Sequence, residues 1–275
     1  MRKVLGKVLF YAFISIVAFL VIVPFLWMIG TSFKAREATY TIPIRWIPER
    51  PSLEAYQAIF SLTNVNFLRA TANSFFLSFI MTVFPLLSSA MAAYAFAKIE
   101  FRAKRILFPL FLATMMIPAA VLMVPNYVLL NTLGLLNTYT GLLLPSLCSA
   151  FAIFFIRQFM MSVDNAYSEA ALMDGASWLR IFFSVMMPLT RPALMTMGLF
   201  NFMGAWNNFM WPLVVLYNRD KWTLQLALGN MGNQFGNFNH YLMAGALVSL
   251  VPIVIVYLVS QKYVEQGLAI GGLKA

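Results

Sequence analysis

Charge is scarce in this sequence and is almost absent from long parts of it. Only 10% of the 275 residues are Asp, Glu, Lys or Arg, whereas 61% are hydrophobic. An ordinary soluble domain has about 25% charged residues. A soluble fold of this length has too little interior to hide so much apolar surface, so lipid is expected to solvate much of the chain. The composition predicts an all-α integral membrane protein.

Cysteine and histidine are nearly missing as well. The single cysteine, Cys148, cannot form an internal disulfide and is expected to be a small packing residue. The single histidine, His240, is expected in a solvated loop. No Gly-x-x-x-x-Gly-Lys-Ser/Thr loop occurs, so nucleotide hydrolysis by that route is excluded. The chain is therefore expected to be neither a metal protein nor an enzyme, and to hold no cofactor of its own.

Long charge-free runs are what the sequence does contain. A charge at the centre of a membrane helix costs about 2.5–3.5 kcal/mol on insertion scales, so each run is interpreted as a span. The longest run is divided at a turn, because it exceeds one crossing. A single domain, 1–275, is expected, with spans at about 8–29, 71–97, 106–130, 138–156, 192–216 and 241–260 and a loop at about 161–190.

The basic residues predict the orientation of these spans. Of 19 Lys and Arg residues, 12 fall on the side of both termini and 7 on the other side. The cluster from Lys98 to Arg105 is the densest. Basic residues mark cytoplasmic loops, so both termini are expected in the cytoplasm. The net charge of +10 is interpreted as this topology signal and not as a nucleic-acid surface.

The spans contain none of the mid-membrane ionisable groups that ion-coupled transporters use. Energy for uphill transport would therefore have to come from a partner. The fifth span instead carries polar residues at helical spacing. They are interpreted either as helix packing, with side-chain hydrogen bonds of about 0.6–2 kcal/mol, or as a path for a hydroxyl-rich solute. The tentative solute-path residues are Asn201, Trp206, Asn207 and Asn208.

The loop before that span has the signals of two short helices. Asp164 or Asn165 can cap a first helix that Gly175 ends. Ser177 can cap a second helix that ends before Pro188. A short helix with a carboxylate and small alanines fits a groove on a partner protein, although a solvated connector has the same composition.

Several motifs resemble those of a known family. Glu169-Ala170-Ala171, then Gly175, then Val185-Met186-Met187-Pro188 resembles the EAA signature of ABC-importer permeases. The family pattern ends in Ile-x-Leu-Pro, so Val185 and Met187 are conservative departures. Three further motifs resemble the carbohydrate-uptake branch, specifically its maltose-permease-like subunits. They are Trp206-Asn207-Asn208, Trp211-Pro212-Leu213 and Gly271-Gly272-Leu273-Lys274.

The resemblance implies the six-helix fold of a type I importer permease in the bacterial inner membrane. It implies a second permease subunit, two ATPase subunits that bind ATP and Mg²⁺, and an extracytoplasmic sugar-binding protein, which the loop 222–240 would reach. The EAA helix would be the coupling helix that docks on an ATPase. Its coupling residues would be Glu169, Ala170, Ala171, Asp174 and Gly175.

Two other functions remain open from the sequence. An importer of a sugar phosphate, such as glycerol phosphate, uses close relatives of these subunits, although the charge-free spans disfavour an anionic substrate. A stand-alone channel or facilitator would also fit the spans, but it would leave the EAA loop without a role.

Overall fold

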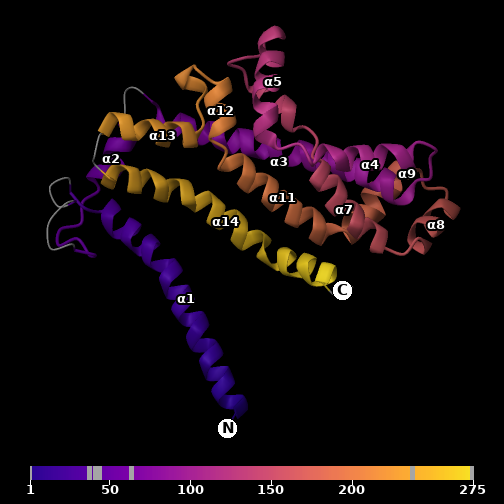
Figure 1. The fold of residues 1–275 in the computed structure, drawn as a ribbon, viewed down its shortest axis with the longest axis horizontal. Coiled ribbons are helices and arrows are strands. Elements are labelled where there is room, and N and C mark those ends of the chain that lie inside the picture. Colours follow the sequence, from indigo (N-terminus) through magenta and orange to yellow (C-terminus); the bar gives the residue numbers. More distant parts are fainter. Residues whose placement is uncertain (1, 36–38, 40–44, 62–64, 236–238, 273–275) are drawn as a thin grey trace. The chain divides into compact units, whose positions relative to one another are not determined.

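The computed structural model describes residues 2–35, 39, 45–61, 65–235 and 239–272, and no β-strand occurs among them (Figure 1). In lipid, backbone N–H and C=O groups have no water partner, and a helix pairs them within one segment. Three helices in the described chain are long and apolar enough to cross a membrane, or up to five segments if each bent pair counts as one span. The predicted all-α fold is confirmed.

The chain forms two compact units. Unit 1 consists of Met1–Arg69 and Leu226–Pro252, and unit 2 of Ala70–Gln225 and Ile253–Ala275. Unit 1 contains α1 (Arg2–Ser32), α2 (Glu54–Phe60), most of α13 (Leu224–Phe235) and the first part of α14 (Asn239–Gly272).

Two expectations for unit 1 are corrected by the structure. The segment expected as a loop at 222–240 is largely helical, because α13 covers Leu224–Phe235. His240 is fully buried within α14, and its Nδ1 lies 3.2 Å from Oγ1 of Thr39. The side chain is therefore an interior residue, not a solvated one.

Helix α1 has almost no internal partner. The most apolar 18-residue segment within Val4–Ser32 contains no buried residue. Tyr11 and Phe13, which point to nearly opposite faces, are 66% and 67% exposed. Apolar surface of this extent is stable only against lipid or another protein.

The core of unit 2 is formed by four helical segments. They are α3 (Phe67–Lys98), α7 (Ala150–Ser162), the stretch Trp178–Leu189 and α11 (Arg191–Trp206). Small residues on α3 allow close packing, since Ala90 and Ala93 are fully buried. The larger buried side chains of this core include Ile153, Ile156, Met160, Phe182, Met186 and Met197.

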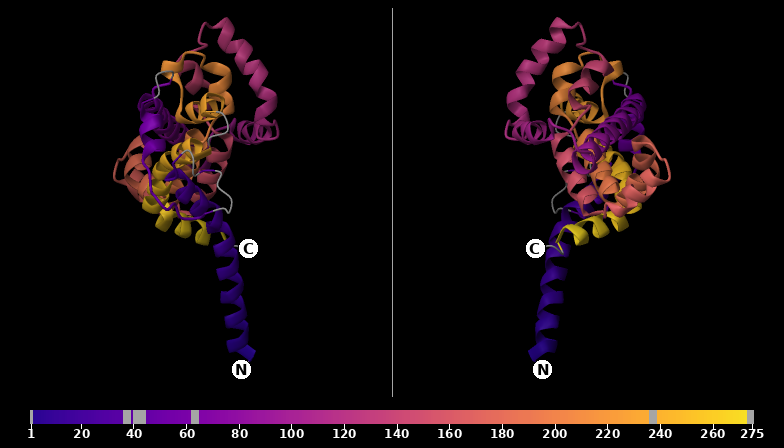
Figure 2. Two further views of the ribbon diagram at one scale, coloured as in Figure 1. Left: turned by 90° about the vertical axis from the view of Figure 1, so that its left-hand side faces the viewer. Right: turned by 90° about the vertical axis from the view of Figure 1, so that its right-hand side faces the viewer.

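The third predicted span, 106–130, is not straight. It consists of α4 (Lys104–Thr114) and α5 (Ala119–Thr132), which meet at an angle of 98° (Figure 2). Pro118, at φ −59° and ψ 134°, separates them. Proline lacks an N–H and restricts the residue before it, which breaks the helix.

The fourth predicted span, 138–156, is also interrupted. It comprises α6 (Tyr139–Leu143), the 3₁₀ turn η2 (Leu144–Ser146) and α7, with a bend of 46°. Cys148 lies in the break before α7 and is exposed, so the expectation that it packs in an interior is wrong.

Candidate functional site

The loop between α7 and α9 folds around the short helix α8 (Ala166–Met173). Asp164 holds its start, because Oδ1 accepts a hydrogen bond of 3.0 Å from the backbone N–H of Ala166. Gly175 follows its end with φ +77°, a left-handed conformation that favours glycine. The predicted helix and its glycine stop are confirmed. Of the two predicted caps, Asp164 acts in this way, and the Asn165 side chain does not.

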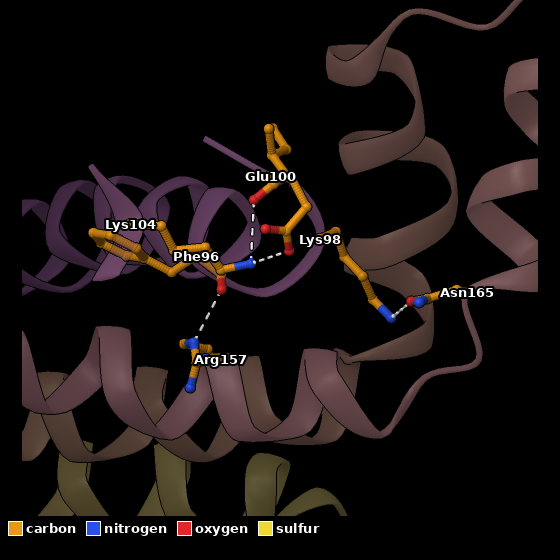
Figure 3. A network of polar contacts seen from close by, with 7 residues as sticks. Phe96, Lys98, Glu100, Lys104, Arg157 and Asn165 are labelled. Atoms are coloured by element: carbon orange, nitrogen blue, oxygen red, sulfur yellow. Dashed lines mark hydrogen bonds and ion pairs between the residues drawn. The ribbon is translucent and has the colours of Figure 1, made fainter. Parts of the chain in front are cut away.

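The Asn165 side chain has a different partner. Nζ of Lys98, the last residue of α3, donates a hydrogen bond of 2.6 Å to Oδ1 of Asn165 (Figure 3). It donates another of 2.6 Å to the carbonyl oxygen of Val163. Lys98 therefore ties the end of α3 to the residues that lead into α8. From the sequence, Lys98 was expected only to mark the orientation of the spans. Its place as the last residue of a span was the signal that it could reach a loop.

Helix α8 has an inner face and an outer face. Ser168 is buried, with Oγ 3.9 Å from Sδ of Met186, and Ala171 packs against the core of unit 2. Glu169 on the outer face is exposed, and no ion pair is found for it among the described residues. The apolar side chain of Met173 is 89% exposed. The other predicted coupling residues, Ala170, Asp174 and Gly175, are exposed as well.

The segment after α8 joins this loop to the core. The Ser177 hydroxyl accepts a hydrogen bond of 3.3 Å from the N–H of Arg180, which confirms the predicted cap of α9 (Trp178–Ile181). The sequence predicted that this helical stretch ends before Pro188, and that prediction is wrong, because the stretch continues to Leu189. A π-helical turn, Phe182–Met186, leads into α10 (Met187–Leu189). The wider turn removes the i−4 carbonyl geometry with which a proline ring clashes.

The fifth predicted span, 192–216, is broken at the polar residues. Helix α11 ends at Trp206, and α12 (Met210–Val215) begins after a gap that contains Asn207 and Asn208. Oδ1 of Asn208 accepts a hydrogen bond of 3.3 Å from the N–H of Trp211. Asn208 therefore belongs to the helix break and not to a continuous stripe. Irregular backbone at membrane depth is tolerated where it is buried in protein or lines a cavity.

Such a cavity is present beside Asn208. Its volume is about 10 Å³, which is room for about one water molecule. Ser74, Ser78 and Thr223 contribute polar lining. Oγ1 of Thr223 is buried and has no hydrogen-bond partner among the described residues. The helix break thus borders a small polar space that has unused hydrogen-bonding capacity.

The other tentative solute-path residues lie in different surroundings. Trp206 is 1% exposed and stacks on Phe202 at 5.8 Å between ring centroids, as an interior packing residue does. Nδ2 of Asn201 is buried, and the described part of the chain offers it no partner. Asn207 is exposed. Only Asn208 of the four lines the cavity. No group of His, Cys, Asp or Glu suited to a metal ion occurs in the described chain.

The fold and most of the sequence of this chain have counterparts in known proteins. Residues 86–270 match the family described as binding-protein-dependent transport system inner membrane component. The arabinooligosaccharides transport system permease protein AraQ of Halalkalibacterium halodurans is 35% identical over 94% of this chain and 94% of its own length. The diacetylchitobiose uptake system permease protein NgcG of Streptomyces coelicolor is 32% identical over 95% of this chain and 87% of its own.

Solved structures agree with this relationship. A chain in the crystal structure of a bacterial ABC transporter involved in the import of the acidic polysaccharide alginate superposes with a TM-score of 0.83. It is 28% identical, and the match covers 94% of this chain and 96% of that one. The resemblance drawn from the EAA motif is confirmed. The chain belongs to the inner-membrane components of binding-protein-dependent transport systems and has the fold of a type I ABC importer permease.

Proposed function

We propose that this chain is the non-catalytic permease subunit of an ATP-driven importer of oligosaccharides. The observation that carries the proposal is the build of α8: an exposed carboxylate at Glu169 and an exposed apolar side chain at Met173, on a helix fixed from behind by Ser168 and Ala171. A helix with this outer face fits a partner's groove. The carboxylate supplies a charge for a basic group there.

The partners follow from the transporter class. Two ATPase subunits bind ATP and Mg²⁺, a second permease completes the path, and an extracytoplasmic protein delivers the sugar. When the ATPases close, they push on α8. Lys98 passes the displacement to α3, and Ala171 passes it to the core of unit 2. Packed helices move as rigid bodies, which converts a local push into a change of access.

The substrate class is inferred from relatives and from side-chain chemistry. The named relatives transport arabinooligosaccharides and diacetylchitobiose, and the structural neighbour imports alginate. The helix break of this chain offers neutral hydrogen-bonding groups at Asn208 and Thr223. Neutral amides and hydroxyls suit an uncharged sugar better than a sugar phosphate, which basic residues would bind.

The proposed topology has six spans and both termini in the cytoplasm. Helix α1, the α3 helix, the two bent pairs α4–α5 and α6–α7, the broken α11–α12 segment and α14 supply the crossings. The positive-inside rule then places Lys98 and the coupling loop on the cytoplasmic side, where the ATPases act.

Reconstitution tests this function directly. The assembled importer is placed in proteoliposomes with its binding protein, and uptake of radiolabelled oligosaccharides is compared with and without internal ATP. Uptake that needs both ATP and the binding protein is expected. Equal uptake without ATP would show a facilitator, and preference for a sugar phosphate over every neutral sugar would reject the substrate class.

A further inference from the structure

A second concave site lies in unit 2, where the α3–α4 connection meets α7. Its volume is about 780 Å³, within the range of about 300–1,000 Å³ for ligand sites. We call it the basic pocket, because four basic residues line it against one carboxylate, that of Glu100; they are Arg102, Lys104, Arg105 and Arg157. None of these residues belongs to α8 or to the break between α11 and α12, so the site is separate from both.

Two contacts fix the orientation of the Arg157 guanidinium in the basic pocket. Its Nε donates a hydrogen bond of 3.0 Å to the carbonyl oxygen of Phe96 (Figure 3). Its guanidinium carbon lies 4.1 Å from the ring centroid of Phe108. Its two terminal amino groups have no partner among the described residues. A guanidinium fixed at Nε and on its face keeps those groups in the geometry that binds two oxygens of one phosphate.

One of the four cations is already compensated. Nζ of Lys104 lies 2.7 Å from Oε1 of Glu100 and also donates to the carbonyl oxygen of Ile99. The hydrogen bond from Lys104 and its charge hold the pKa of the Glu100 carboxyl below its usual range, so Glu100 stays ionised at neutral pH. Three guanidinium groups remain. Arg105 also interacts with the Glu100 charge at longer range, but no carboxylate in the described chain forms a salt bridge with any of the three. The basic pocket therefore favours an anion.

The surroundings of the pocket indicate which anion. Helix α4 begins at the pocket and has no buried residue. Ile106 and Leu110, one turn apart, are 67% and 57% exposed. A ligand that places an anionic group on the arginines and an apolar chain along α4 would satisfy both features. A free phosphate ion would use only the first.

We propose that the basic pocket binds the phosphate of an anionic phospholipid, whose acyl chains lie along the exposed apolar side chains of α4. Clustered cations beside membrane helices bind anionic head groups in this way. Because Arg157 also bonds to Phe96, the bound lipid would brace the same end of α3 from which Lys98 reaches the coupling loop.

Lipid binding to the assembled importer tests the proposal. The purified complex is titrated with phosphatidylglycerol in detergent, and bound lipid is counted by native mass spectrometry. The double variant Arg102→Gln/Arg105→Gln changes two exposed side chains and should fold normally. Its affinity is expected to fall on the order of 5-fold for each cation removed. Arg157→Lys keeps the charge without the planar fork and should give a smaller loss.

A matched control removes the same charge elsewhere. Lys7→Gln/Arg180→Gln changes two exposed basic residues outside the pocket and should leave the affinity unchanged. Equal affinity in wild type and Arg102→Gln/Arg105→Gln would overturn the proposal. So would complete displacement of the lipid by inorganic phosphate, which would indicate a soluble anion. If Arg102→Gln/Arg105→Gln loses a protein subunit of the complex but still binds lipid normally, the basic pocket is a protein-docking surface and the proposal is wrong.

Discussion

Glu169 is the residue on which the proposed docking of α8 to an ATPase depends most directly. Glu169→Lys keeps a long exposed side chain, so the chain should insert and fold, but it reverses the charge offered to the ATPase. ATP-driven uptake is expected to fall to background in proteoliposomes. Glu49→Lys, at a side chain that is 73% exposed outside the coupling loop, is the control and should transport normally. Near-normal uptake by the Glu169 variant would refute docking through this carboxylate.

Asn208 distinguishes a solute path from simple packing. Asn208→Leu keeps a side chain branched at Cγ with the same number of heavy atoms, but removes the acceptor for the Trp211 N–H and one polar wall of the cavity. Sugar uptake should drop while the ATPase subunits still co-purify. Met210→Leu, two residues along at a 55% exposed side chain, serves as the control. If the Asn208 variant loses assembly rather than uptake, packing is the better interpretation.

Gly175 tests whether the positive φ at the end of α8 requires glycine. A Cβ at this position would meet nothing within 4 Å, so Gly175→Ala carries only the cost of φ +77°, about 1–2 kcal/mol. The apparent Tm of the purified protein should decrease by a few degrees. Gly204→Ala, equally free of contacts but inside helix α11, should be neutral or stabilising by up to about 1 kcal/mol. Equal effects of the two substitutions would contradict the backbone argument.

At the scale of elements, the link between α3 and α8 depends on Lys98. Lys98→Met keeps the apolar stem and removes both hydrogen bonds, each worth about 1.5–3 kcal/mol for a charged donor. Amide hydrogen exchange in α8 is expected to become faster, and uptake should fall while ATPase binding persists. Lys221→Met is the matched control, because Nζ of Lys221 also donates to a backbone carbonyl, that of Asn137, but lies outside the loop and the basic pocket. An unchanged rate of amide hydrogen exchange in α8 would show that Lys98 does not link α3 to α8 in the proposed way.

Helix positions were predictable from sequence to a greater extent than helix shape. Charge-free runs reflect the cost of charge in lipid, and each predicted span has helix within it. Bends depend on local backbone geometry instead. Pro118 produced a break of 98°, whereas Pro85 and Pro252 lie inside long helices. Sequence spacing does not distinguish these prolines, because neighbouring helices determine which kink is tolerated.

The candidate site shows the same division. The exposed charge of Glu169 and the positive φ of Gly175 could be predicted because both properties are local to the motif. Lys98 and Thr223 were missed because their roles depend on partners far away in the chain. Lys98 bonds to residues 65 and 67 positions later, and no short-range pattern marks such a contact.

For the molecule as a whole, topology is the first property to test. In a Cys148→Ser background, Ala103→Cys places a thiol in the α3–α4 connection, and Ile47→Cys places one at an 83% exposed position between α1 and α2. A membrane-impermeant maleimide should label position 47 in intact cells and position 103 only after lysis. Labelling of position 103 from outside would reverse the proposed orientation.

The contact between α3 and α8 joins one charged donor, Lys98, to two neutral acceptors. Lys98 bonds to a backbone carbonyl and a side-chain amide, and neither acceptor carries a net charge. Dissolved ions screen pairs of opposite charges but weaken a short ion–dipole contact much less. Neither acceptor gains or loses a proton near neutrality. The contact between α3 and α8 through Lys98 is therefore expected to persist at salt concentrations that weaken surface ion pairs.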